Sequence, residues 1–202
     1  ALLEPGETVA LPDAEARHLR VARVLAGEPG VRLDGAGGRA AALLSKDGRG
    51  AVVRERLPAR GEPSRRVTVA LGVGELSRVE WALEKGTECG AARFALVAAA
   101  RSQRAHVAAA AARIERLRRV VAEAAKQCDR SVVPAVDAPG PLADVLSGLP
   151  RPLFVARPGA PRLPGGAPLA ADVSVAVGPE GGFDGGEERL LAESGAIPFG
   201  LG

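Results

Sequence analysis

The spacing of apolar and polar positions divides the chain into two parts. Up to about residue 62, short apolar pieces alternate with turns such as Asp34-Gly35 and Asp47-Gly48, which is typical of antiparallel strands joined by tight turns. We expect strands over 8–11, 31–33, 40–44 and 51–53, and a short helix over 13–25. The first part is therefore predicted to be a small β-rich domain, 1–62, folded as a barrel.

The second part begins at Val67 and alternates apolar runs with segments of helical spacing. Helices are expected over 76–89 and 107–128, and the second of these carries apolar residues on one face from Ile114 to Ala124. Strands are expected over 67–73, 94–98, 152–156, 173–177 and 197–201. Such alternation predicts an α/β domain, 67–202, with a mainly parallel sheet. Residues 63–66 are expected to be a linker.

One apolar run ends in a glycine-rich segment. Val173–Val177 is followed by Gly178-Pro179-Glu180-Gly181-Gly182, a combination that predicts a buried strand and a tight turn. Asp184 and Glu187 then form a capping-box pattern, and Gly195 is placed to end the helix. A strand thus delivers a glycine-rich loop to a helix N-terminus, where open α/β sheets bind ligands.

The loop alone leaves several interpretations open, and a tight turn without a ligand is as consistent with it as a binding loop. No Gly-Lys-Ser/Thr follows, so it is not a Walker phosphate loop, and it is not a G-x-G-x-x-G dinucleotide loop. A nucleotide-dependent metabolic enzyme would need a lysine or a metal-binding carboxylate near the loop, where Glu180 alone qualifies.

Composition adds a bias toward arginine. The formal charge is only +3, but 27 residues are basic and Lys46, Lys85 and Lys126 are the only lysines among them. Arginine suits phosphate because its planar fork binds in a bidentate manner. The same bias also follows from a GC-rich genome, so it is weak evidence for nucleic acid by itself.

Other classes of protein lack support in the sequence. Cys89 and Cys128 are far apart and are expected to be buried free thiols of a reducing compartment. Two histidines, His18 and His106, are too few for a metal cluster or a Ser-His-Asp triad without further support. No apolar run approaches the ~18 residues of a membrane span, so neither a metal nor a membrane is expected.

Three stretches together resemble the RsmE family of bacterial 16S ribosomal RNA methyltransferases. The string from Gly178 to Phe183, G-P-E-G-G-F, matches the family's signature. The stretch from Glu80 to Gly90 is similar to the family's segment ending K-A-T-E-L-G, with Gly86 and Cys89 as departures. The third stretch follows the pattern R-W-x-x-I-x-x-E-A-x-x-Q-x-x-R-x-x-x-P at Arg116, Leu117 (in the Trp place), Glu123, Ala124, Gln127, Arg130 and Pro134.

Looser matches extend the resemblance toward the N-terminus. Arg101-Ser102 resembles the family's R-S after the second strand, and His18-Leu19, Arg23 and Gly27-Glu28 resemble its H-L, R and G-D. The resemblance implies a SPOUT-type fold, in which the C-terminal strands form a trefoil knot around S-adenosylmethionine. It also implies a smaller N-terminal PUA-like barrel that binds RNA.

The implied reaction is methylation of uridine N3 in 16S ribosomal RNA by a cytoplasmic homodimer that uses S-adenosylmethionine. Glycine permits close approach of the cofactor to the backbone of the loop. The residues expected to bind the cofactor are Ala156, Arg157, Gly178, Pro179, Glu180, Gly181, Gly182, Leu201 and Gly202. The residues expected to contact RNA are Arg20, Arg23, Arg101, Arg104, Arg116 and Arg130. No residue identifies itself as the catalytic base, and the sequence does not specify the target uridine.

The two ends of the printed chain carry an expectation of their own. The family continues with R-I-L-R-x-E-T-A, the last knot loop and helix, at the point where Gly200-Leu201-Gly202 ends the chain. The chain also starts at Ala1 and contains no Met. We therefore expect residues beyond those printed, and the alternative to an enzyme is a non-catalytic RNA-binding protein with a SPOUT-like fold.

Overall fold

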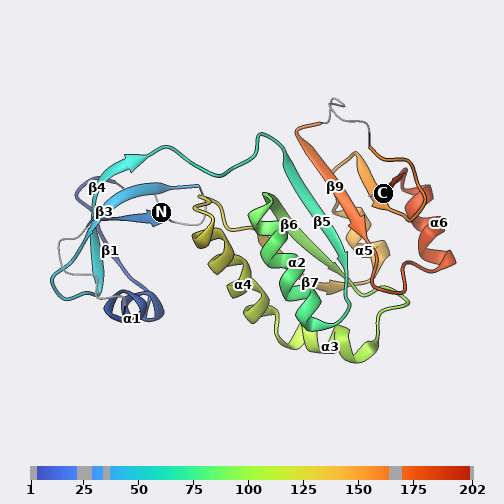
Figure 1. Cartoon of the computed structure of the whole chain (residues 1–202), viewed down its shortest axis with the longest axis horizontal. Coiled ribbons are helices and arrows are strands. Elements are labelled where there is room, and N and C mark those ends of the chain that lie inside the picture. Colours follow the sequence, from blue (N-terminus) through green and yellow to red (C-terminus); the bar gives the residue numbers. More distant parts are fainter. Residues whose placement is uncertain (1–3, 22–28, 34–36, 164–169, 201–202) are drawn as a thin grey trace. The chain divides into compact units, whose positions relative to one another are not determined.

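The chain forms two compact units, shown in a computed structural model that describes residues 4–21, 29–33, 37–163 and 170–200 (Figure 1). The first unit comprises residues 1–62 together with 129–133, and the second comprises 63–128 and 134–202. Both units are built from helices and strands, so the fold is of the mixed α/β class that the sequence predicts.

The first unit contains an antiparallel sheet of four strands in the order β1-β4-β3-β2. Ala40 of β3 and Val53 of β4 form its buried core together with Val9 of β1, and the predicted turn at Asp47-Gly48 is confirmed by a φ of +67° at Gly48. β1 and β2 lie at the two edges, so the described strands form an open sheet. The elements are β1 (Thr8–Ala10), α1 (Asp13–Val21), β2 (Pro29–Leu33), β3 (Arg39–Leu44) and β4 (Gly50–Leu57).

The second unit is organised around a sheet of six strands in the order β10-β8-β9-β5-β6-β7. Every recorded pairing between these strands is parallel. The parallel sheet predicted from the alternation of strands and helices is thus confirmed. The strands are β5 (Arg66–Gly72), β6 (Ala91–Val97), β7 (Ala135–Gly140), β8 (Leu153–Ala156), β9 (Asp172–Val177) and β10 (Ile197–Phe199).

Helices cover both faces of this sheet, with α2 and α4 on one side and α5 and α6 on the other (Figure 1). Because side chains alternate along a strand, Phe94 of β6 serves one face and Ala95 serves the other. Gly86 lets α2 approach Phe94, since a Cβ at residue 86 would lie 2.7 Å from the ring. The helices are α2 (Leu76–Glu88), α3 (Arg104–Ala112), α4 (Ile114–Gln127), α5 (Leu142–Ser147) and α6 (Gly185–Glu193).

Three predictions for the elements of the second unit are wrong or incomplete. The helix expected over 107–128 is two helices, α3 and α4, separated at Arg113, where the backbone turns to φ −114° and ψ 22°. The apolar face from Ile114 belongs to α4 alone, and the alanine run before it gives no such face. β7 and α5 were missed, because A-V-D-A-P-G contains Asp and Pro, which are depleted in strands, and α5 is short.

Two further findings concern chemistry outside the sheet. Both cysteines are free, as expected, but Cys89 is exposed and Cys128 is only half-buried, so the expectation of two buried thiols is wrong. Cys89 follows the last residue of α2, at a surface end of that helix. Within the described ranges, no helix is long and apolar enough to cross a membrane, and no cluster of three or more metal-binding side chains occurs.

Residues 129–133 leave the second unit and pack into the first. Arg130 is only 3% exposed, and its Nη2 donates to Glu62 Oε2 at 2.7 Å. Ser131 is fully buried, and its Oγ accepts the Arg60 N–H at 2.8 Å. Gly61 permits this approach, since its φ is +74° and a Cβ there would lie 3.1 Å from the backbone of Arg130. The first unit is therefore assembled from two separate segments of chain.

We expect a Glu62→Gln variant to remove part of the pH dependence of the first unit. Burial alone raises the pKa of the Glu62 carboxyl, but Arg130 and the Val132 N–H outweigh it and hold the pKa below the ordinary value. A depressed carboxyl pKa gives stability that is complete above pH ~4.5 and is lost as pH falls through the folded value. The variant should lose about 1–2 kcal/mol at pH 7. Denaturant unfolding at several values between pH 3 and pH 7 measures this, and parallel curves for both proteins would contradict it.

Candidate functional site

A cavity of about 540 Å³ lies at the carboxyl ends of β8 and β9, beside α6. Parallel pairing places Val155 opposite Ala176, so the ends of the two strands reach the same edge of the sheet. Ligands of open α/β sheets bind at this edge. The cavity is lined by Arg101, Val155, Ala156, Arg157, Pro158, Val177, Gly178, Pro179, Glu180, Gly181, Gly182, Phe183, Glu188 and Leu191.

The loop between β9 and α6 forms one wall of the cavity and depends on its glycines. The Gly182 N–H donates to the Pro179 carbonyl at 2.8 Å, which closes a tight turn. Gly182 has φ +70°, a region that side chains disfavour, and a Cβ at Gly178 would lie 3.1 Å from Gly182 Cα. The loop therefore presents backbone rather than side chains to the cavity over much of its length.

The loop also rests on the end of β5. A Cβ at Gly72 would lie 2.4 Å from Pro179 N and Cδ and 2.7 Å from the Gly178 carbonyl carbon. A Cβ at Gly74 would lie 2.4 Å from the Glu180 carboxylate. Because Gly72 and Gly74 have no side chains, the glycine loop can pack directly against the end of β5 and the residues that follow it.

The N-terminus of α6 is fixed by a complete capping box, as the sequence predicts. The Asp184 carboxylate accepts the Glu187 N–H at 2.8 Å, and the Glu187 carboxylate accepts the Asp184 N–H at 3.0 Å. The second oxygen of Glu187 accepts the Ala100 N–H at 2.8 Å. This buried carboxylate therefore joins the glycine loop to the segment that follows β6.

Two arginines and two glutamates supply the charge of the cavity. Arg101 donates one N–H to the Gly181 carbonyl at 2.8 Å. Arg157 and Glu188 form an ion pair at 3.1 Å, and Glu180 lies 3.6 Å from Arg78. The one contact recorded for the Arg101 guanidinium is with the loop, which leaves further N–H donors for an anionic or carbonyl group.

The structure brings together seven of the nine residues predicted to bind a cofactor. Ala156 and Arg157 come from β8 and its continuation, and Gly178–Gly182 come from the loop. Leu201 and Gly202 lie outside the described residues. Their neighbour Gly200 does lie close to the segment after β8, because its N–H donates to the Pro161 carbonyl at 2.9 Å.

The arginines predicted to contact RNA are dispersed. Arg101 lines the cavity, Arg104 is exposed at the start of α3, and Arg116 pairs with Glu80 at 2.7 Å. Arg130 does not fit the expectation of an exposed phosphate contact, since it is buried and bonded to Glu62. Arg23 and the side chain of Arg20 lie outside the described residues.

Several lining residues were not identified from the sequence as part of the site. Val155 and Val177 belong to expected strands, and their place at the strand ends was a usable signal. Glu188 and Leu191 of α6 are three residues apart and therefore share a helix face, which the capping pattern could have indicated. Arg101 was expected at an RNA surface, and its position in the cavity depends on the packing of two loops.

The residues of the cavity suit a ligand that combines an apolar ring system with polar ends. Its volume lies in the range of about 300–1,000 Å³ that is typical of small-molecule sites. Val155, Val177 and Leu191 offer apolar walls, and the loop offers backbone groups. Arg101, Arg157, Glu180 and Glu188 add two charges of each sign at the lining.

Comparison with known proteins finds relatives over the whole chain. Residues 61–202 match the sequence model of the RNA methyltransferase domain. The chain is 32% identical over 207 residues to ribosomal RNA small subunit methyltransferase E of Synechocystis, which covers 96% of this chain and 67% of the relative.

Solved structures show the same fold. A ribosomal RNA small subunit methyltransferase E from Neisseria gonorrhoeae, bound to S-adenosyl methionine, superimposes with a TM-score of 0.90 at 27% identity and covers 100% of this chain and 86% of its own. A probable rRNA methyltransferase from Porphyromonas gingivalis has a TM-score of 0.81 at 28% identity and covers 97% and 85%.

Proposed function

The chain belongs to the RsmE family of ribosomal RNA small subunit methyltransferases, and we propose that it methylates N3 of a uridine in 16S ribosomal RNA. Its methyl donor is S-adenosylmethionine. The observation that carries the proposal is the cavity with its glycine loop at the ends of β8 and β9. The chain shares its fold with a relative whose structure contains S-adenosyl methionine.

The residues of the cavity fit this donor. The backbone of Gly178–Gly182 would hold its polar groups, and Val155, Val177 and Leu191 would enclose the adenine. Glu188 or Glu180 would face its ammonium group. When bound, S-adenosylmethionine supplies a methyl group on a sulfonium, which is already a good leaving group, so the protein's main contribution is alignment of the acceptor.

The acceptor nitrogen imposes a second requirement. Uridine N3 carries a proton near neutral pH, and its loss must be assisted by a base or by a cation that stabilises the uridylate. Arg101 lines the cavity and holds N–H donors beyond its bond to Gly181, so we assign it the role of orienting the uracil oxygens. Base pairing hides N3, and the uridine must therefore be unpaired or flipped out of a helix.

We infer that the first unit is a PUA-like RNA-binding domain, with Arg20 and Arg23 among its phosphate contacts. Arg104 and Arg116 are the proposed phosphate contacts of the second unit. We also infer a SPOUT-type trefoil knot, which the contact between Gly200 and the segment after β8 supports. An experimental structure that traces residues 157–202 tests the knot. A cytoplasmic location follows from a ribosomal RNA substrate.

We expect the protein to form a two-fold dimer that buries at least ~1,000 Å² in total. Trp81 on α2 is 64% exposed and Ile197 on β10 is 46% exposed, and burial of either apolar side chain would favour an interface of the second unit. Sedimentation at micromolar concentration measures the mass. A monomer that methylates at full rate would contradict the dimer.

A methyl-transfer assay tests the function itself. Purified protein, S-adenosylmethionine with a labelled methyl group and small ribosomal subunits lacking the modification should give N3-methyluridine in 16S RNA. Calorimetry with S-adenosylmethionine, ATP and NAD should show binding of the first alone. Binding of RNA without transfer would favour the non-catalytic alternative, and binding of ATP alone would exclude the proposal.

A further inference from the structure

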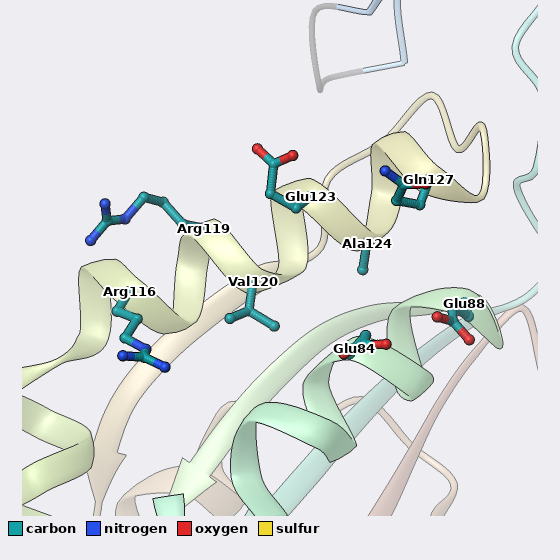
Figure 2. Close-up of a pocket in the computed structure, with 8 residues that line it drawn as sticks. All are labelled: Glu84, Glu88, Arg116, Arg119, Val120, Glu123, Ala124 and Gln127. Carbon is teal, nitrogen blue, oxygen red and sulfur yellow. The ribbon is translucent and has the colours of Figure 1, made fainter. Parts of the chain in front are cut away.

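A second depression, of about 550 Å³, lies between α2 and α4 (Figure 2). It is separate from the cofactor cavity. α2 begins after the carboxyl end of β5 and ends at Glu88, just before β6 begins, so its last turns lie toward the opposite edge of the parallel sheet. Glu84 stands eight residues after Leu76, or roughly 12 Å along the helix. We call this depression the α2–α4 groove; it is lined by Glu84, Glu88, Arg116, Arg119, Val120, Glu123, Ala124 and Gln127.

The groove has an apolar floor and a polar rim. Val120 and Ala124 point from α4 toward α2, and Glu84 and Glu88 stand on α2 across from them (Figure 2). Arg119 and Glu123 extend from α4 on the side away from α2 (Figure 2). A flat group can therefore rest on the apolar strip while its edge meets carboxylates.

The carboxylates of the groove have basic partners, but not every polar group of the groove is used. Lys85 bonds to Glu84 at 2.8 Å and Glu88 at 2.9 Å, and these bonds raise its pKa above the ordinary value. Arg116 pairs with Glu80, and Glu123 with Lys126. No contact within the described chain is recorded for the Arg119 guanidinium or the Gln127 amide. Each carboxylate also keeps acceptor sites, because it offers about four lone pairs.

Two sequence stretches that the cofactor cavity does not use meet at this groove. Glu88 comes from the stretch Glu80–Gly90. Glu123, Ala124 and Gln127 come from the part of α4 that matches the family pattern R-W-x-x-I-x-x-E-A-x-x-Q. Both stretches carry the family resemblance, yet they are distant in sequence from the glycine loop. Their convergence on one surface indicates a role other than cofactor binding.

We propose that the α2–α4 groove holds an unpaired nucleotide of the RNA substrate, with a base that carries an exocyclic amino group. This rests on the proposed RNA-methylating function. The base lies on Val120, which is half-buried and keeps an exposed apolar surface, its amino group donates to Glu84 or Glu88, and Arg119 meets the phosphate. Carboxylates accept from amino groups such as cytosine N4, whereas the single N3–H donor of uracil lies between two carbonyl oxygens that repel a carboxylate. The nucleotide in the groove is therefore not the methylated uridine.

The test compares two single-stranded RNA hexamers of equal charge, oligo-cytidine and oligo-uridine, by fluorescence anisotropy at low salt. The wild-type protein should prefer cytidine by roughly 5- to 100-fold. The double variant Glu84→Gln/Glu88→Gln should lose this preference and bind oligo-cytidine more weakly, although it removes two negative charges. The control Glu115→Gln/Glu193→Gln removes the same charge from exposed sites outside the groove. It should bind both RNAs slightly more tightly and keep the preference.

The outcomes separate the groove from the proposed function. Equal binding of both hexamers by the wild-type protein, or tighter oligo-cytidine binding by the groove variant, would overturn the proposal. The alternative would then be that the groove binds a basic segment of a protein. If methyl transfer is observed without the preference, the groove proposal alone is wrong. If the preference and its loss are observed without methyl transfer, the groove stands and the proposed reaction fails.

Discussion

A Gly72→Ala variant is expected to bind S-adenosylmethionine roughly 10- to 100-fold more weakly, because forcing a methyl group against packed atoms costs about 1–3 kcal/mol. The new Cβ would lie 2.4 Å from Pro179 N and 2.7 Å from the Gly178 carbonyl carbon. These are backbone atoms of the glycine loop, so no side-chain rotation relieves the contact, and the loop must move away from β5. Calorimetric titration with S-adenosylmethionine measures the loss.

The matched control is Gly185→Ala. Gly185 is the first residue of α6, and a Cβ there would meet nothing within 4 Å. Its affinity for the cofactor should equal that of the wild-type protein. If the Gly72→Ala variant also binds S-adenosylmethionine with normal affinity, the close contact between Gly72 and the loop is not needed to position the loop for the cofactor.

A Glu187→Ala variant should destabilise the second unit by about 3 kcal/mol, because it leaves a buried donor unpaired and removes half of a capping box. Glu187 is 9% exposed, and its two oxygens accept the N–H groups of Ala100 and Asp184. The melting temperature should fall by roughly 6–12 °C. Differential scanning calorimetry, with and without S-adenosylmethionine, measures the change.

Glu193→Ala serves as its control. Glu193 lies on the same helix but is exposed at its last turn, so its loss should change stability by no more than about 0.5 kcal/mol. Similar melting temperatures for the two variants would show that the bond to Ala100 contributes nothing beyond helix propensity.

Local signals in the sequence identified the elements that carry the site. The β-branched run before Gly178 and the Asp184–Glu187 pair predicted β9, the loop and the start of α6, because each feature acts within a few residues. The end of α6 was also predicted: Gly195 has φ +74° and follows the cap residue Ser194. The five loop residues expected to bind the cofactor lie together for the same reason, since Gly178–Gly182 are consecutive in the chain.

The features that were not predicted from the sequence depend on contacts between residues far apart in the chain. The order of the strands places β8 beside β9, and no local pattern encodes that neighbour. Arg130 matched a family position and was expected at an RNA surface, but it is buried because Glu62, far away in sequence, reaches it. Likewise, α3 and α4 separate at Arg113 without any proline or glycine there, so only tertiary contacts could have revealed the break.

The return of residues 129–133 to the first unit has a consequence for synthesis on the ribosome. The first unit lacks the partners of Arg60 and Glu62 until Ser131 and Arg130 have been made, and these follow residue 62 by about 70 positions. At roughly 5–20 residues per second, the N-terminal segment waits about 4–14 s for its completion. During that interval the first unit of the nascent chain is unfinished. We therefore expect a protease to cut stalled chains that end before residue 129, and to cut them inside the first unit.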